Sequence, residues 1–209
     1  MIINILSFDD SKYADIIHEA FTIIRKANTK IYSAEQKNII RDGIGDKMAA
    51  ALKDFPTDQE ENRSYYSYVE TMLRTALLYY DQTLYIKTKN LNNNLLIDWG
   101  AEELYIYLLS AIKKNSAKEF NDISNWLDKV FQPILLSTCT IIPHLPSKPF
   151  FADDSISIAY EYVKEKNMFN FCECQLDPIN SAEYLSLKII ETTKCHESPA
   201  VKCQELIGN

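Results

Sequence analysis

The residues best suited to chemistry lie near the C-terminus: Cys172, Cys174, Cys195 and Cys203. Four thiolates can hold a zinc ion in a tetrahedral site. The spacing argues against zinc, because C-x-C is a less usual chelating pair than C-x-x-C and a predicted helix start separates the other two cysteines. If residues 167–176 are extended, Cys172 and Cys174 share one face with apolar neighbours, as small buried hydrophobic residues do. The sequence therefore favours core cysteines, with a zinc site and a thiol–disulfide couple as alternatives.

Other motifs for catalysis are missing from the sequence. It contains no G-x-S-x-G, no glycine-rich phosphate-binding loop and no H-E-x-x-H. The stretch DGIGD at 42–46 has G-x-G but no third glycine, and no predicted strand precedes it. Of the three histidines, His18 lies on a predicted helix, His144 in a loop between prolines and His196 beside the cysteines. The sequence therefore predicts no catalytic residue, no cofactor and no enzyme.

The composition restricts the partners. The net charge is −7 and the sequence pI about 5.0, which disfavours binding to nucleic acids and to anionic membranes. The same charge suits a basic protein partner. The N-terminus has no basic, apolar signal sequence, and no run approaches about 18 apolar residues. The odd number of cysteines, 5, predicts reduced thiols. We therefore expect a cytoplasmic protein.

Helix start signals must position any site, and they recur along the chain. Each combines a capping residue with a following apolar stripe at helical spacing. They predict helices that begin near Ser7, Ser33, Thr57, Asp98, Ser116, Pro133, 153–154, Asp177 and Ser198. Two stretches, 83–89 and 167–176, have strand character. Only 4 glycines are present, which suits helices joined by short loops.

These signals predict an all-α fold. We expect one helical-bundle-like domain over residues 1–209, with about seven to eight helices, short loops and one or two short extended segments. Prolines at 143–149 leave a sub-boundary near 143–150 as an alternative within that domain.

One part of this pattern resembles a known class. The stretch YVETMLRTALLYYDQTLYI is followed by DWGAEELYIYLLSAIKKNSAKEFNDISNWL, together covering roughly residues 65–131. It is similar to all-helical immunity proteins encoded beside bacterial polymorphic toxins. The resemblance implies a cytoplasmic protein that binds and neutralises a cognate toxin, and it implies no catalytic residues.

The leading hypothesis is therefore an immunity-type inhibitor of a basic toxin domain. Its binding surface would use the acidic clusters Asp58, Glu60, Glu61, Asp153 and Asp154, which also suit helix caps. Two alternatives stay open. One is a metal-dependent enzyme or zinc-stabilised domain that uses the C-terminal cysteines, and the other is a helical scaffold or regulatory module that binds another protein.

Overall fold

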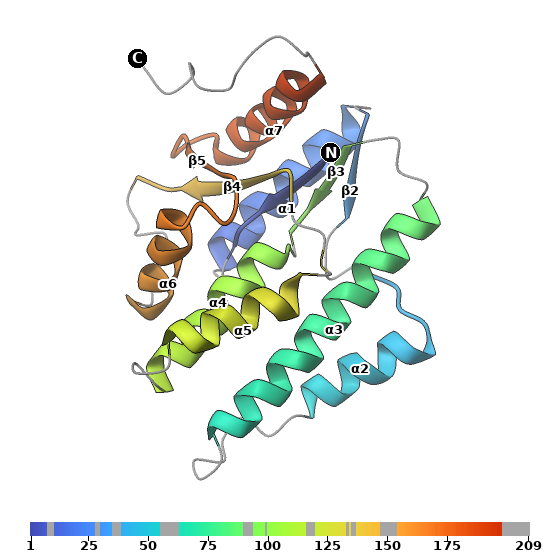
Figure 1. The fold of residues 1–209 in the computed structure, drawn as a ribbon. Coiled ribbons are helices and arrows are strands. Elements are labelled where there is room, and N and C mark those ends of the chain that lie inside the picture. Colours follow the sequence, from blue (N-terminus) through green and yellow to red (C-terminus); the bar gives the residue numbers. More distant parts are fainter. Residues whose placement is uncertain are drawn as a thin grey trace.

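The structure, a computed structural model, contains a parallel β-sheet between layers of helices (Figure 1). It describes residues 1–7, 11–27, 30–34, 39–54, 63–89, 94–98, 100–115, 120–132, 134, 137–146 and 154–197. The elements are β1 (Ile2–Ile5), α1 (Ser11–Lys26), β2 (Ile31–Ala34), α2 (Gly43–Lys53), α3 (Arg63–Lys89), β3 (Asn94–Ile97), α4 (Ala101–Asn115), α5 (Phe120–Phe131), β4 (Cys139–His144), α6 (Asp154–Glu165), β5 (Phe171–Gln175) and α7 (Ser181–Glu197).

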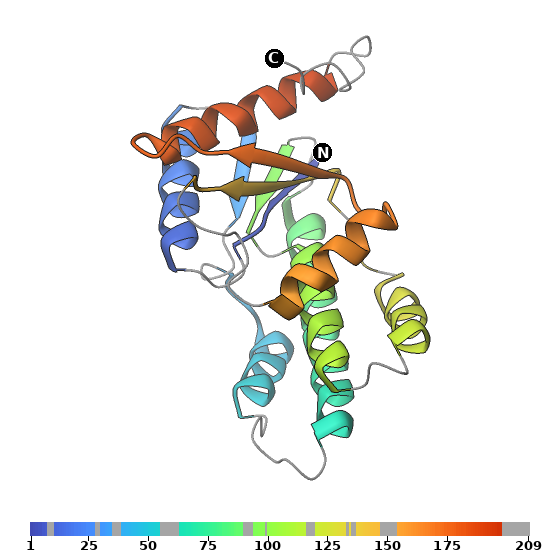
Figure 2. The same ribbon diagram turned by 90° about the vertical axis from the view of Figure 1, so that its left-hand side faces the viewer.

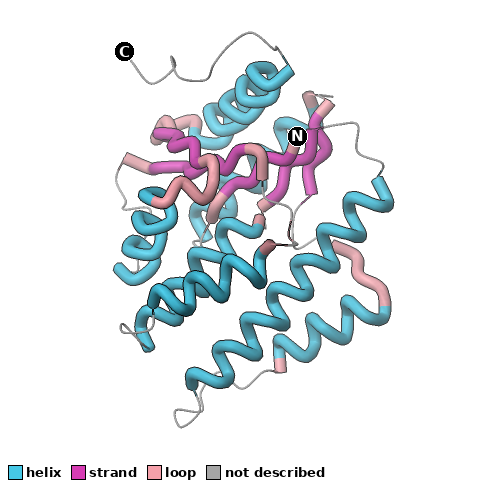
Figure 3. Tube along the Cα trace, in the orientation of Figure 1, coloured by secondary structure: helices cyan, strands magenta, loops and turns pink. Residues whose placement is uncertain are grey.

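The sheet has five strands in the order β2-β3-β1-β4-β5, and every neighbouring pair is parallel. Figure 3 shows the strands, in magenta, gathered among the helices. The central strand β1 pairs with β3 through Ile3 and Leu96, and with β4 through Ile3 and Cys139. Ile3, Ile5 and Leu96 are fully buried. Strands covered on both faces are near-continuous apolar runs, and IINI, NLLI and CTIIPH fit that description.

Helices cover both faces of the sheet. The first and last helices, α1 and α7, pack together on one face, and α4 and α6 pack together on the other (Figure 2). On α1 the apolar stripe of Tyr13, Ile17, Phe21 and Ile24 is buried, as its helical spacing predicts. Helix α5 packs against α4, while α2 and α3 form a pair that extends away from the sheet (Figure 1).

The α2–α3 pair is held by polar contacts at the start of α2. Arg41 makes a bidentate ion pair with the buried Asp81 of α3, at 2.8 Å and 2.6 Å. Asp42 caps α2, accepts from the Ile44 backbone N–H and is hydrogen-bonded to the Tyr80 hydroxyl. The Tyr80 hydrogen bond lowers the pKa of Asp42 and raises that of Tyr80.

The prediction of an all-α fold is wrong, because the described residues include five strands. Ser33, read as a helix start, lies in β2, and the residues after Pro133 lead into β4 rather than a helix. Helix α3 continues through 83–89, where strand character was expected. The extended reading of 167–176 is confirmed by β5. The predicted last helix, at Ser198, lies outside the described residues.

Within the described part of the chain, no helix is both long and apolar enough to cross a membrane.

Candidate functional site

The carboxyl ends of β1, β3 and β4 form a switch point of the sheet topology, the place where open α/β sheets have their ligand-binding crevice. Strand β1 leads into α1 on one face of the sheet, whereas β3 and β4 lead toward α4 and α6 on the other face (Figure 2). Neighbouring strands whose connections diverge in this way open a gap above their carboxyl ends, and ligands of open α/β sheets bind there. The residues that follow these three strands are therefore the first candidates for function.

Polar residues follow two of these strand ends. Asp98 follows β3 directly and is half-buried. Ser7 follows β1 by two residues, and its backbone N–H donates to Oε2 of Glu103, on the first turn of α4, at 3.5 Å. A long hydrogen bond of this kind is weak. It nevertheless places the Glu103 carboxylate beside the backbone N–H of Ser7, the first N–H after β1 that does not bond to a neighbouring strand.

A buried polar cluster lies directly below this crevice. Glu102 accepts hydrogen bonds from the Ser137 backbone N–H at 2.6 Å, from the Ser137 hydroxyl at 3.1 Å and from Nδ2 of Asn4 at 3.1 Å. Oδ1 of Asn4 in turn accepts the Gly100 backbone N–H at 3.1 Å. A Cβ at Gly100 would overlap the Asn4 amide and the Glu102 carboxylate. The cluster therefore ties β1 to the turn after β3 and holds the backbone next to Asp98.

Burial controls the charge of this cluster. Glu102 is fully buried, and desolvation raises the pKa of its carboxyl group, against the lowering effect of the Ser137 and Asn4 hydrogen bonds. Glu102 therefore holds its proton to a higher pH than an exposed glutamate does.

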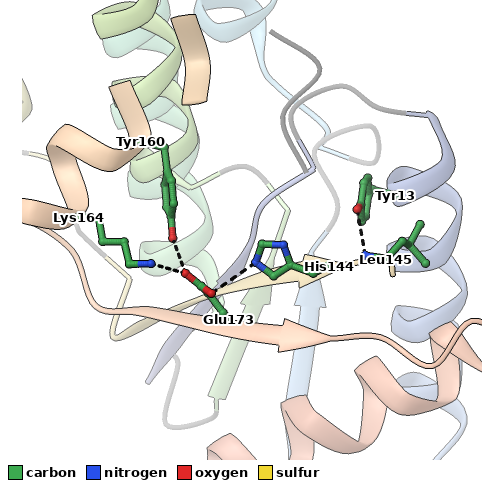
Figure 4. Close-up of polar contacts among 6 residues, drawn as sticks. All are labelled: Tyr13, His144, Leu145, Tyr160, Lys164 and Glu173. Carbon is green, nitrogen blue, oxygen red and sulfur yellow. Dashed lines mark hydrogen bonds and ion pairs between the residues drawn. The ribbon is translucent and has the colours of Figure 1, made fainter. Parts of the chain in front are cut away.

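A second polar group lies at the ends of β4 and β5 (Figure 4). Glu173 of β5 accepts from the Tyr160 hydroxyl at 3.2 Å, pairs with Lys164, and has Oε2 at 3.9 Å from Nε2 of His144. The hydrogen bond with Lys164 is the main cause that lowers the pKa of Glu173 and raises that of Lys164. Burial lowers the pKa of His144, against the opposing charge of Glu173. His144 is therefore a neutral imidazole near pH 7, able both to donate and to accept a hydrogen bond.

The buried hydroxyl of Tyr13 joins helix α1 to the carboxyl end of β4. The backbone N–H of Leu145, immediately after β4, donates to the Tyr13 hydroxyl at 3.2 Å (Figure 4). Tyr13 is fully buried in the first turn of α1. This hydrogen bond therefore ties the first turn of α1 to the residue that follows β4.

Of the five residues in the predicted acidic surface, the structure describes one. Asp154 is the exposed first residue of α6. Asp58, Glu60, Glu61 and Asp153 lie outside the described residues.

The cysteines have the placement that strand alternation predicts. Cys172 and Cys174 lie on β5, with Cys174 buried, while Phe171 points to the opposite face of the sheet, where its ring centroid lies 5.2 Å from that of Tyr160 of α6. Cys195 lies in α7, and Cys203 is outside the described residues. Among the described residues, no group of three or more histidine, cysteine or acidic side chains could hold a metal ion. Zinc at these cysteines thus gains no support from the described part of the chain.

Sequence reasoning missed the strand-end residues. Ser7 and Asp98 carry capping signals, and His144 stands between prolines, so each has a local explanation. The signal that could have found them is the alternation of short apolar runs with helical segments, which is typical of parallel α/β sheets.

The fold and the position of the crevice define a class: α/β proteins with a parallel sheet and a ligand site at the carboxyl edge. Comparison with solved structures then finds two kinases with a similar fold. The chain is similar to thymidylate kinase from Candida albicans, with a TM-score of 0.59, 13% identity and 92% of each chain covered. It is also similar to thymidylate kinase from Ehrlichia chaffeensis, with a TM-score of 0.58, 11% identity, and 93% of this chain and 98% of that chain covered.

A third similar structure is deoxyadenosine kinase from M. mycoides with bound dATP. Its TM-score is 0.46 at 15% identity, and 91% of this chain and 100% of that chain are covered. No protein-family model matches the sequence, and no curated protein matches it. At these identities the likeness establishes the fold.

The likeness overturns the sequence-based hypotheses about class, function and partner. The resemblance to all-helical immunity proteins is wrong, because residues 65–131 include β3 of the parallel sheet as well as α3, α4 and α5, in a fold similar to that of two thymidylate kinases. The predicted toxin inhibitor and its basic toxin partner are wrong for the same reason. The prediction that the chain is not an enzyme is also wrong, since the similar folds are those of enzymes.

Proposed function

We propose that the chain is a phosphotransferase that binds a nucleoside or nucleotide in the crevice at the carboxyl ends of β1, β3 and β4. The observation that carries this proposal is the thymidylate-kinase fold, shared over 92% of both chains. The polar strand ends support it, because they lie at the position where this sheet topology binds ligands.

Asp98 is the residue that we assign to the acceptor. It follows the strand next to β1, and its backbone is held by the buried Asn4–Gly100 link. A carboxylate at that place can accept the proton of an acceptor hydroxyl or orient the acceptor by a hydrogen bond.

A nucleoside triphosphate with Mg²⁺ is the phosphate donor that such a fold implies. The residues after β1 do not fit a glycine-rich cradle for its phosphates. Residues 6–12, LSFDDSK, contain no glycine, and the Ser7 backbone N–H donates to Glu103. Glycine allows the close backbone approach that such a cradle needs. We therefore assign no residue of this loop to a phosphate group.

Phosphoryl transfer to a panel of acceptors tests the proposal. The purified chain is incubated with MgATP and with thymidine, deoxyadenosine or their 5′-monophosphates, and the products are separated by chromatography. We expect a phosphorylated product from one acceptor class, and loss of about 10²- to 10⁴-fold in rate in Asp98→Asn, the range for a general base. Glu161→Gln, on the exposed face of α6, is the matched control and retains the rate.

Two results would contradict the proposal at different points. If no acceptor is phosphorylated and none raises the melting temperature, the chain is not a nucleotide-binding phosphotransferase. If a product forms and Asp98→Asn keeps the full rate, the assignment of Asp98 is wrong.

The cytoplasmic location stays a proposal. It is supported by the three free cysteines in the described residues, Cys139, Cys172 and Cys174, which suit a reducing compartment.

A further inference from the structure

Three cysteines lie on one face of the β4–β5 pair. The register pairs Ile141 with Cys172 and Pro143 with Cys174, and Cys139 precedes Ile141 by two residues. Residues two apart on a strand point the same way, so all three thiols face the same side of the sheet. Cys139 and Cys174 are buried, whereas Cys172 is half-buried and reaches solvent. The face is therefore two buried thiols beside one accessible thiol.

Specific neighbours stabilise a thiolate at the accessible position. Cys139 is hydrogen-bonded to Cys172 across the strand pair, and Lys188 of α7 faces the same thiols. The Cys139 hydrogen bond, with the charge of Lys188, lowers the pKa of Cys172 to about 6, against burial and the charge of Glu173. A thiol with such a donor and a nearby cation is ionised and nucleophilic at neutral pH.

Cys174, two residues further along β5, differs from Cys172 in each of these respects. Burial raises the pKa of Cys174 to about 11, and the charges of Cys172 and Glu191 act in the same direction against Lys188. Cys174 is buried, and no hydrogen bond from a neighbouring thiol lowers its pKa, so its thiol stays protonated. Of the three thiols, Cys172 alone combines access with a stabilised thiolate.

We propose that Cys172 is a site of reversible thiol–disulfide exchange with a small disulfide, of the class of oxidised glutathione. Cys139 is a positioning residue, because it acts by donating a hydrogen bond to the Cys172 sulfur. A small partner is required, since the same face of the sheet lies toward α7 and leaves the Cys172 sulfur only partly accessible.

The exchange is balanced without another oxidant. The Cys172 thiolate attacks one sulfur of the disulfide, an S–S bond forms between Cys172 and that half, and the original S–S bond breaks. The departing half leaves as a thiolate and takes a proton from water. An added thiol reverses the reaction by attacking the mixed disulfide, so the state of Cys172 follows the ratio of small disulfide to thiol.

The pH dependence of alkylation tests the thiolate. The full chain is treated with iodoacetamide at a series of pH values, and each cysteine is followed by peptide mass spectrometry. We expect the labelling of Cys172 to rise with a midpoint near pH 6. We also expect incubation with oxidised glutathione at neutral pH to add one glutathione, at Cys172, removable by dithiothreitol.

Variants separate the role of Cys139 from a loss of structure. Cys139→Ala removes the donor, and the midpoint should rise toward the ordinary thiol value of about 8.5. Cys139→Ser keeps a hydroxyl donor and should keep a low midpoint. Lys188→Gln should raise the midpoint by a smaller amount and does so without altering the strand pair. Cys174→Ala is the matched control and should leave the midpoint unchanged.

The proposal is overturned if the wild-type midpoint lies in the ordinary thiol range, or if glutathione is added at other cysteines and not at Cys172. An unchanged midpoint in folded Cys139→Ala overturns the role of Cys139. If Cys139→Ala does not fold, two other results together overturn the roles of Cys139 and Lys188. These are a Cys172 labelling midpoint that is unchanged in Lys188→Gln and one in the ordinary thiol range in Cys139→Ser.

Discussion

Glu102→Gln tests the buried cluster beneath the crevice. The Asn4 side chain cannot turn over, because its Oδ1 accepts the Gly100 backbone N–H, so its Nδ2 must face Glu102. A glutamine keeps one oxygen for the Ser137 backbone N–H but places an NH₂ group opposite Nδ2, where the carboxylate oxygen now lies at 3.1 Å. Two donors then face each other, and an unsatisfied buried donor costs about 1–3 kcal/mol.

The pH dependence of that cost follows from the raised pKa of Glu102. Folding favours the protonated carboxyl group, so the contribution of Glu102 to stability is fully present below its unfolded pKa, about 4.3, and is lost as the pH rises through its folded pKa. Each unit by which burial raises the pKa removes about 1.4 kcal/mol across that window. The glutamine does not titrate. The wild type should therefore exceed Glu102→Gln in stability most at acid pH, and the difference should narrow as the pH rises.

Urea unfolding between about pH 5 and pH 8 measures this difference, with equal m-values required for the comparison. Glu161→Gln, exposed on α6, serves as the control and should show a small difference at every pH. A difference that stays constant, or that widens toward high pH, would refute the reasoning, because it would mean that burial does not raise the pKa of Glu102 in the folded chain.

Two further substitutions test packing at named contacts. Gly45→Ala places a Cβ 2.6 Å from Cε1 of Tyr80 and should destabilise the chain by about 1–3 kcal/mol in urea unfolding, whereas Gly43→Ala meets nothing within 4 Å and should be neutral or slightly stabilising. Equal effects of the two would contradict the packing of α2 on α3. Tyr13→Phe leaves the buried Leu145 backbone N–H without its hydroxyl acceptor and should lower stability by about 1–3 kcal/mol. A Tyr13→Phe melting temperature equal to that of the wild type would show that this hydrogen bond contributes nothing.

The helices were predictable because their signals are local. Asp177 accepts the backbone N–H groups of Ile179 and Asn180, both at 2.8 Å, just before α7, as its capping signal predicts. Helix α2 starts at the cap residue Asp42 rather than at Ser33, because Ser33 is taken up by the sheet. A capping residue in the sequence thus indicates where a helix can begin. Pairing between distant segments of the chain decides whether the helix forms there.

The strands were not predictable by the same reasoning. Each has four to six residues and is apolar, and periodicity alone cannot distinguish a short buried strand from the apolar part of a helix. The extended segment at β5 was predicted correctly because Cys172 and Cys174 alternate with the exposed Glu173 and Gln175 at one edge of the sheet.

The candidate site depended on those strands. Asp98 and Ser7 are far apart in the sequence and come to one edge only because β1 and β3 are parallel neighbours. Because residues 2–5 and 94–97 were not predicted to be strands, Ser7 and Asp98 each kept a local explanation as a cap, and the site at the strand ends could not be inferred.

The position of β1 in the sheet has a consequence for synthesis of the chain. Strand β1 is central in the sheet and is made before the other four strands, yet its contacts are with residues made much later: Asn4 with Glu102, 98 residues on, and Ile2 with Thr138, 136 residues on. Contacts this distant in sequence slow folding, because the intervening chain must be closed into a loop before they form. An apolar strand without partners is also prone to pair with other chains. The central strand of the sheet therefore stays unpaired in the nascent protein until β3 and β4 have been made, and it is prone to aggregation during that time.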